Sequence, residues 1–329
     1  MKLLFLSAAD VRRALPMAEA IAGMKGAFAQ LSGGEAHVPQ RTQLPIARHE
    51  GISIFMPAYL AATDALAVKI VSVFPQNVKR NMPLIHGLVV ALDSKSGIPL
   101  AVLEGATLTA IRTGAGSGAA TDLLARRDAS VAAIIGSGVQ ARKQLEAVCS
   151  VRSIVEVRVF SPNKIHAAAF AREMAGQGPI PDNIHVTATA DEAVRGADVI
   201  STATSSSTPV FSGAALVAGS HVNAVGSYRT DMQEVDVDTV ARALVVVDSR
   251  EAAREEAGDL MIPIADGVFG FDHIHAELGE IVNGTRTGRE RDDQITYFKS
   301  VGVAVQDVIA ASIALDNARR EALGLEIEL

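Results

Sequence analysis

The strongest structural signal of the chain lies near its centre, in Ser130-Val131-Ala132-Ala133-Ile134-Ile135-Gly136-Ser137-Gly138-Val139-Gln140-Ala141. An apolar run typical of a buried strand leads into a glycine-rich turn, and the residues after the turn suit a helix. In such a turn, backbone N–H groups and the start of the helix face a pyrophosphate. The stretch therefore predicts a dinucleotide-binding strand–turn–helix unit, with Ala141 in place of a third glycine.

The residues that follow strengthen this prediction, because strand-like and helical segments alternate along them. Strand-like runs cover residues 155–160, 184–188, 198–201, 222–225 and 244–247, and helical stretches such as 164–174 and 191–195 lie between some of them. Such alternation is typical of a parallel, doubly wound sheet. We therefore expect a Rossmann domain over residues 119–302.

The residues before the glycine turn have a different pattern. A short strand at the start leads to a helix capped near Ser7, and apolar spacing over residues 11–31 predicts a helix that ends at Gly33-Gly34. Strands are expected at 41–46, 52–58, 66–74, 85–93 and 98–103, the last two forming a hairpin, and long helices at 107–126 and 295–320. The fold class is thus α/β, with the Rossmann sheet inserted in a discontinuous α+β domain of residues 1–118 and 303–329.

Composition bounds the classes of function. The 329 residues suit about two domains, and 30 Lys+Arg against 37 Asp+Glu give a net charge of −7, which argues against nucleic-acid binding. The single cysteine, Cys149, excludes an intrachain disulfide and is expected to be buried in the helix after the glycine turn. The histidines lack metal-ligand spacing and no apolar run has the length of a membrane span, so we expect no metal and a cytoplasmic enzyme.

Nearly the whole chain carries strings that resemble one known family. They are Val38-Pro39-Gln40-Arg41, Phe55-Met56-Pro57-Ala58-Tyr59, Ala67-Val68-Lys69-Ile70-Val71, Leu108-Thr109-Ala110-Ile111-Arg112-Thr113-Gly114-Ala115, the glycine turn, Asn223-Ala224-Val225-Gly226, and Ile295-Thr296-Tyr297-Phe298-Lys299-Ser300-Val301-Gly302-Val303-Ala304-Val305-Gln306-Asp307. Together they resemble the ornithine cyclodeaminase/mu-crystallin family, and its ketimine reductase members more than its cyclodeaminases. The resemblance implies a homodimer, whose discontinuous domain makes the dimer contact and the substrate pocket. It also implies hydride transfer between nicotinamide and the α-carbon of an amino or imino acid.

The resemblance assigns Arg41 and Arg112 to the substrate carboxylate, which a planar guanidinium binds well. Lys69 lies in an otherwise apolar run, so its side chain either extends to the surface or is held for function. The resemblance favours function, and we expect Lys69 to orient the substrate and to exchange a proton at the imine nitrogen. Met56 and Tyr228 are predicted from their positions to line the substrate pocket.

A second candidate proton donor lies in Gly226-Ser227-Tyr228-Arg229-Thr230-Asp231. Ornithine cyclodeaminases carry a catalytic aspartate two residues after this glycine, where the present chain has Tyr228. This difference argues against cyclodeamination. Asp231 is predicted to act as an acid or to orient the substrate, with a turn-forming aspartate as the alternative interpretation.

The choice of coenzyme depends on the end of the second strand of the Rossmann domain, Phe160-Ser161-Pro162-Asn163-Lys164. NAD enzymes usually place an acid there for the ribose 2′-hydroxyl. Here Ser161, Asn163 and Lys164 are suited to a 2′-phosphate, which favours NADP(H), although Ser and Asn also suit the 2′-hydroxyl of NAD(H). The other expected cofactor contacts are Arg112, Thr113, Gly136, Gly138, Val139, Gln140, Ala203, Thr204, Val225, Ser300 and Gly302.

These patterns predict an NAD(P)H-dependent imine reductase. Its substrate would be a small 2-imino acid, either a cyclic ketimine such as Δ1-pyrroline-2-carboxylate or an open-chain one, and its product the L-amino acid. Three alternatives stay open: an ornithine cyclodeaminase, an amino-acid dehydrogenase, and a nucleotide-binding protein without catalysis.

Overall fold

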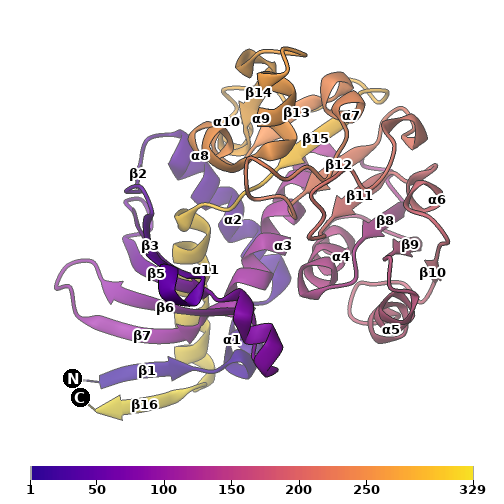
Figure 1. Cartoon of the computed structure of the whole chain (residues 1–329). Coiled ribbons are helices and arrows are strands. Elements are labelled where there is room, and N and C mark those ends of the chain that lie inside the picture. Colours follow the sequence, from indigo (N-terminus) through magenta and orange to yellow (C-terminus); the bar gives the residue numbers. More distant parts are fainter. Residues whose placement is uncertain (1, 329) are drawn as a thin grey trace. The chain divides into compact units, whose positions relative to one another are not determined.

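The chain folds into two units in the computed structural model, which describes residues 2–328 (Figure 1). The first unit comprises the chain up to Arg112 together with the segment from Ala304 onward, and the second comprises Thr113–Val303. The division after Arg112 falls within helix α3 (Gly105–Leu124), N-terminal to the boundary expected after residue 118. The same helix therefore contributes residues to both units.

The first unit is built on an eight-stranded sheet with the order β16-β1-β7-β6-β5-β4-β2, in which β3 also pairs with β4. Its neighbours are antiparallel except for β1 and β7, which run parallel. The strands are β1 (Lys2–Leu6), β2 (Ala36–His37), β3 (Thr42–Ile46), β4 (Gly51–Leu60), β5 (Ala65–Val73), β6 (Ile85–Asp93), β7 (Pro99–Glu104) and β16 (Leu325–Glu328), and two short 3-10 turns cover Ala47–His49 and Pro75–Arg80.

Helix α11 (Ala304–Glu321) contacts both the helices and the sheet of this unit, namely α1 (Ala8–Ala14), α2 (Met17–Ser32), β4, β5 and β6. Its first eight residues are all buried, as expected for a helix covered on both sides. The packing against α2 is close, since a Cβ at Gly23 would lie 2.5 Å from the side chain of Ile313. The C-terminal helix thus places its own side chains next to strands formed hundreds of residues earlier.

The second unit contains an eight-stranded sheet with the order β10-β9-β8-β11-β12-β15-β13-β14, and its neighbouring strands run parallel. This confirms the predicted doubly wound fold. The strands are β8 (Val131–Ile135), β9 (Glu156–Phe160), β10 (Ile184–Val186), β11 (Val199–Thr202), β12 (His221–Ala224), β13 (Leu244–Val247), β14 (Ile274–Glu277) and β15 (Thr296–Lys299). The helices are α4 (Val139–Val151), α5 (Lys164–Met174), α6 (Ala190–Val194), α7 (Val237–Arg242), α8 (Arg250–Glu256), α9 (Gly258–Ala265) and α10 (Leu278–Val282), with 3-10 turns at Gly213–Ala215 and Phe271–His273.

Two sequence predictions of helices were wrong. The first helix is two, α1 and α2, because Pro16 lacks the N–H group that a continuous helix requires at that point. Residues 295–320 do not form one helix, because residues 296–299 are β15, placed between β12 and β13. The aromatic and β-branched Thr296, Tyr297 and Phe298 favour a strand, and Gly302, with a φ of 88°, turns the chain before α11 begins.

Other local predictions were confirmed. The Ser7 side chain accepts a hydrogen bond from the backbone of Asp10 and caps α1, and Cys149 is buried in α4. Within residues 2–328, none of the helices is both long and apolar enough to span a lipid bilayer.

Candidate functional site

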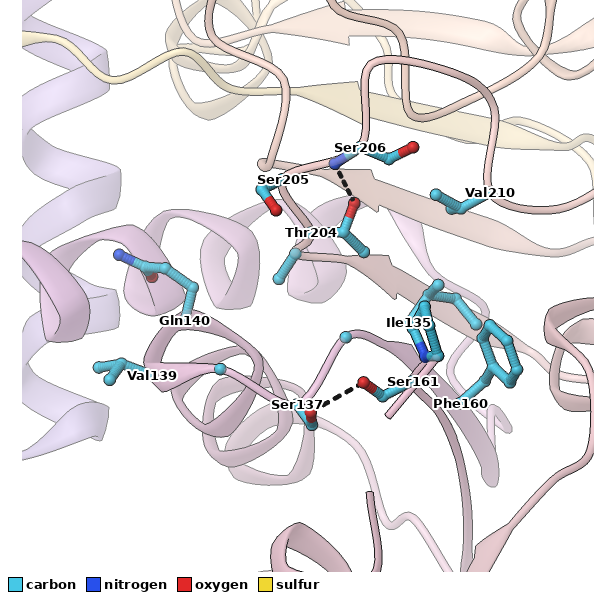
Figure 2. A pocket seen from close by; sticks show the side chains of 14 residues that line it. Ile135, Ser137, Val139, Gln140, Phe160, Ser161, Thr204, Ser205, Ser206 and Val210 are labelled. Carbon is cyan, nitrogen blue, oxygen red and sulfur yellow. Dashed lines mark hydrogen bonds between the residues drawn. The ribbon is translucent and has the colours of Figure 1, made fainter. Parts of the chain in front are cut away.

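A cavity of about 640 Å³ opens in the second unit where β8, β9 and β11 end (Figure 2). It is lined by the glycine turn, the end of β9 and the loop after β11, comprising Ile135, Gly136, Ser137, Gly138, Val139, Gln140, Phe160, Ser161, Pro162, Ala203, Thr204, Ser205, Ser206 and Val210. The strand order reverses between β8 and β11, since the chain goes from β8 outward to β10 and returns to β11. Ligands of doubly wound sheets bind outside the carboxyl ends of the strands at this switch point.

The glycine turn is tightly packed at Gly136 and open at Gly138. Gly136 has a φ of 116°, and a Cβ there would lie 2.5 Å from the carbonyl oxygen of Ala203, so the turn touches the loop after β11. Gly138 has open space in place of a side chain, and it begins α4 without a side-chain cap. The first N–H groups of α4 are therefore suited to a phosphate.

The end of β9 brings only part of the predicted 2′ site to the cavity. Ser161 lines it and accepts a hydrogen bond from the Ser137 hydroxyl at 3.0 Å (Figure 2). Asn163 instead caps α5, because its side-chain oxygen accepts from the backbone N–H groups of Ile165 and His166. Lys164 lines a separate shallow hollow on α5. None of the described residues that line the cavity at the glycine turn is acidic.

The loop after β15, predicted to lie near the nicotinamide, is held by a residue that the sequence reasoning missed. Asp248, buried at the end of β13, accepts hydrogen bonds from Ser300 Oγ at 2.8 Å, Val301 N at 2.9 Å and Gly302 N at 2.8 Å. Burial raises the pKa of Asp248, and these hydrogen bonds oppose the rise. The available signal was an acid directly after an apolar strand. Val225 follows β12, and Thr113 lies on α3.

The first unit holds a buried cluster of charged side chains from three elements. Lys69 of β5 lies with its Nζ 2.7 Å from Asp307 Oδ2 of α11, and Arg112 Nε of α3 donates to Asp307 Oδ1 at 3.0 Å. Arg112 also donates from Nη1 to Gln306 Oε1 at 2.8 Å. The side chains of Lys69, Arg112 and Asp307 are 4%, 7% and 1% exposed, so the cluster is almost completely removed from water. The predicted residues Arg112 and Lys69 are thus brought together by Asp307, a residue that the sequence analysis did not predict to lie in the site.

The electrostatics of this cluster favour an anionic ligand. One carboxylate faces two cations, and burial is the main cause that lowers the pKa of Lys69 to about 8. The charge of Asp307 opposes this shift, whereas the positive charges of Arg112 and Arg41 add to it. An excess of buried positive charge is costly, and the cost is offset when an anion binds or when the lysine loses its proton. The cluster is therefore suited to a carboxylate, and the lowered pKa of Lys69 brings its ionisation closer to neutral pH.

Two further predicted substrate residues lie near this cluster in the first unit. Met56 of β4 is the cross-strand partner of Lys69, and its side chain is buried. Arg41 is half-buried directly before β3, close enough for its charge to lower the pKa of Lys69.

The remaining candidates, Tyr228 and Asp231, lie in the loop after β12 of the second unit. Tyr228 is 54% exposed. Asp231 accepts from Arg229 Nε at 2.9 Å, and both side chains of this ion pair are 62% exposed. The hydrogen bond from Arg229 lowers the pKa of Asp231, which makes its carboxyl a poor proton donor. The role of Asp231 stays a prediction that these contacts do not support.

Comparison with known proteins agrees with this architecture. The ornithine cyclodeaminase/mu-crystallin family model matches residues 1–322, so the chain belongs to this family. The chain is 44% identical over 327 residues to a Δ1-pyrroline-2-carboxylate reductase of Bacillus cereus, covering 99% of this chain and 100% of the relative. Its structure is similar to that of the Thermococcus litoralis Δ1-pyrroline-2-carboxylate reductase in complex with NADH and L-proline, with a TM-score of 0.93, 43% identity, and coverage of 98% and 100%. It is also similar to an archaeal alanine dehydrogenase dimer with bound NAD, with a TM-score of 0.92, 34% identity and coverage of 100% for both chains.

Proposed function

We propose that this protein is an NAD(P)H-dependent reductase that converts a small 2-imino acid into the L-amino acid, with Δ1-pyrroline-2-carboxylate as the first candidate substrate. The observation that carries the proposal is the buried Lys69–Asp307–Arg112 cluster, which combines a carboxylate-binding arginine with a lysine of pKa about 8. The dinucleotide-type cavity of the second unit supports it. So does the similarity to the Bacillus cereus reductase over the full length of that relative.

In the proposed reaction, Arg41 and Arg112 hold the substrate carboxylate, which fixes the face of the C=N bond that is reduced. The Lys69 ammonium donates a proton to the imine nitrogen and makes the imine carbon more electrophilic. The hydride for the new C–H bond would come from the reduced coenzyme. Asp307 holds Lys69 and Arg112 in place, and neutral Lys69 regains its proton from solvent.

The residues of the second unit fit a dinucleotide coenzyme. Gly136 and Gly138 would face the pyrophosphate together with the start of α4. Ser161 would face the adenosine ribose, and the loop of Ser300 and Gly302, held by Asp248, would face the nicotinamide. NADP(H) is favoured because none of the described residues lining the cavity carries a carboxylate that would repel a 2′-phosphate. NAD(H) is the alternative, since a related reductase binds NADH.

The direct test is turnover by purified protein. Δ1-pyrroline-2-carboxylate is mixed with NADPH or NADH, the loss of nicotinamide absorbance is followed, and L-proline is identified by chiral chromatography. A panel of open-chain and six-membered cyclic 2-imino acids establishes the substrate range. Failure to reduce any member with either coenzyme would overturn the proposal.

The alternative enzymes give different products under defined conditions. An ornithine cyclodeaminase would form proline and ammonia from ornithine with only catalytic amounts of NAD. We expect no such reaction, because Tyr228 stands where ornithine cyclodeaminases carry a catalytic aspartate. An amino-acid dehydrogenase would require ammonia to reduce a 2-oxo acid. A nucleotide-binding protein without catalysis would bind NADPH and turn over none of these substrates.

The homodimer implied by the family resemblance is part of the proposal, and the dimeric archaeal alanine dehydrogenase supports it. Size-exclusion chromatography with light scattering measures the mass directly. The cytoplasmic location expected from the sequence stays a prediction, which fractionation of the source cells would test.

A further inference from the structure

Glu234 lies in the loop between β12 and α7 of the second unit, and its side chain is completely buried. A buried carboxylate costs free energy unless hydrogen bonds replace its hydration. Its partners therefore indicate what it does. No motif of the sequence pointed to this residue.

All four hydrogen-bond partners of the Glu234 carboxylate come from the ends of two adjacent strands. Oε1 accepts from Thr204 N at 2.6 Å and from Thr204 Oγ1 at 2.5 Å, just after β11. Oε2 accepts from Gly226 N at 2.6 Å, after β12, and from Thr202 Oγ1 at 3.1 Å. The carboxylate thus joins the two loops that leave β11 and β12 at the edge of the sheet where the cavity opens.

One of these loops forms a wall of the cavity. Thr204 lines it, and Thr204 Oγ1 in turn accepts from Ser206 N at 3.0 Å (Figure 2). Further along, Val210 N donates to the carbonyl oxygen of Glu234 at 2.9 Å. Glu234 therefore holds this wall, residues 203–210, at both ends. The wall in turn touches the glycine turn, through the contact of Ala203 with the position of Gly136.

The fit around Glu234 explains a glycine of the Asn223-Ala224-Val225-Gly226 motif. A Cβ at Gly226 would collide with both carboxylate oxygens of Glu234, since it would lie closer to them than any real contact allows. Any side chain at position 226 would therefore displace the carboxylate from its donors. The position of the Glu234 carboxylate therefore depends on the absence of a side chain at Gly226.

A buried ion pair fixes the backbone of Glu234. Asp259 Oδ1 accepts from Glu234 N at 2.6 Å and from Val235 N at 3.0 Å. Asp259 Oδ2 lies 2.7 Å from Lys299 Nζ, and neither side chain of this pair is exposed. Burial raises the pKa of the Glu234 carboxyl, whereas its bonds from Thr204 and the charge of Lys299 oppose the rise and favour the ionised form.

We propose that Glu234 is a positioning residue for the coenzyme: by joining the loops after β11 and β12 it holds residues 203–210 in the conformation that binds the dinucleotide. It sets the affinity of the cavity without touching the reacting atoms. The inference rests on the proposed function only for the identity of the ligand, a nicotinamide dinucleotide.

The test compares Glu234→Gln with a matched variant, Asp198→Asn, using NADPH and NADH as probes. In Glu234→Gln an NH2 group, which can only donate, replaces one of the two carboxylate oxygens. Each of these oxygens accepts from a backbone N–H group, so one backbone N–H loses its acceptor. Asp198 has a comparable set of donors, Arg126 Nη2 at 2.6 Å, Ser130 N at 2.8 Å and Val131 N at 3.0 Å. These contacts lie at the amino ends of β8 and β11, away from the cavity.

We expect the Kd for the preferred nucleotide, measured by its fluorescence, to rise about tenfold or more in Glu234→Gln. In Asp198→Asn the melting temperature should fall while the Kd stays within about twofold of wild type. At saturating coenzyme, kcat of Glu234→Gln should change much less than the KM for coenzyme. Thr202→Val removes only the 3.1 Å hydrogen bond to Glu234 and should raise the Kd by a smaller factor. This variant replaces Glu234→Gln in the test if Glu234→Gln does not fold.

An unchanged Kd in Glu234→Gln or, if that variant does not fold, in Thr202→Val overturns the inference. So does an equal rise of the Kd in Asp198→Asn, because that would be a general effect of destabilisation. The Kd measurements need no turnover. A wild-type protein that binds nucleotide and reduces no imino acid therefore contradicts the proposed reaction and leaves the role of Glu234 standing.

Discussion

The Lys69 ammonium lies 2.7 Å from the Asp307 carboxylate, although one residue is on a strand of the N-terminal sheet and the other on the C-terminal helix. Arg112 shares the same carboxylate, at 3.0 Å. A single acid thus holds the two cations to which we assign proton transfer and carboxylate binding. Substitutions in this cluster should change the rate of imine reduction, which can be measured separately from the Kd for the coenzyme.

Replacing Lys69 by Met should remove the proton donor while keeping the apolar stem of the side chain. We expect kcat for imine reduction to fall at least about hundredfold, the usual contribution of a general acid. The Kd for NADPH should stay near the wild-type value, because Lys69 is not among the residues expected to contact the coenzyme. Lys69→Arg keeps the charge but holds its proton too firmly, so it should also be slow. Full activity in Lys69→Met would exclude Lys69 from the mechanism.

The pH dependence of kcat/KM should report the titration of Lys69. With a pKa of about 8, the ammonium form predominates below this pH, and kcat/KM should fall tenfold per unit above it. The negative charge of Asp307 raises the pKa of Lys69, so Asp307→Asn should move this limb to lower pH. The profile of Lys69→Met separates the titration of the substrate from that of the enzyme. A limb at the same pH in all three proteins would contradict the assignment.

Gly136→Ala should lose nucleotide binding. The added methyl group would collide with the Ala203 carbonyl oxygen, 2.5 Å away, at a φ of 116° that L-residues rarely adopt. We expect a loss of stability of about 1–3 kcal/mol and at least a tenfold weaker Kd for NADPH. Gly26→Ala is the control, since its site on α2 has open space and alanine favours helices, so stability should rise by up to about 1 kcal/mol. Equal nucleotide binding by both variants would show that the turn does not hold the dinucleotide.

Ser161→Asp should shift the coenzyme preference towards NADH. A carboxylate at the end of β9 would accept from a ribose 2′-hydroxyl and repel a 2′-phosphate. We expect the ratio of kcat/KM for NADPH to that for NADH to fall about tenfold or more. Asn163→Asp is the comparison, because this side chain caps α5 and its acid would serve the cap equally well. A preference that follows position 163 and not 161 would place the ribose differently from our proposal.

His221 should make the protein less stable in acid. Burial, aided by the charge of Arg289, lowers its pKa from 6.5 to about 3, so between these values the unfolded chain binds a proton that the folded chain does not. The free energy of unfolding therefore falls as the pH decreases through this range, by about 2 kcal/mol at pH 5 relative to pH 8 from this group. In His221→Gln this contribution disappears. The difference in the free energy of unfolding between wild type and variant, measured with urea, should therefore be smaller at pH 5 than at pH 8 by this amount. Parallel pH dependences would contradict the buried neutral imidazole.

Local patterns were enough to predict the doubly wound class of the second unit and the kind of ligand it is suited to, although β14 was not predicted and β15 was predicted as part of a helix. An apolar strand, Gly136 and Gly138, and a following helix are contiguous, and each element depends mainly on its own residues. The same holds for the Ser7 cap and the antiparallel strands of the first unit. Where local propensity was misjudged, as at Pro16 and at Thr296–Lys299, the residues themselves carried the correct signal.

The partners of the charged residues required the folded chain. Lys69 could be recognised as a cation in an apolar strand. Its pairing with Asp307 could not be predicted, because the two residues lie on elements far apart in the sequence. Likewise, Glu234 and Asp248 look like ordinary loop acids until the sheet brings the ends of β11, β12, β13 and β15 to one edge. A sequence pattern reports which face of an element is apolar, whereas the pairing of buried charges depends on which elements pack against each other and on the water that this packing removes.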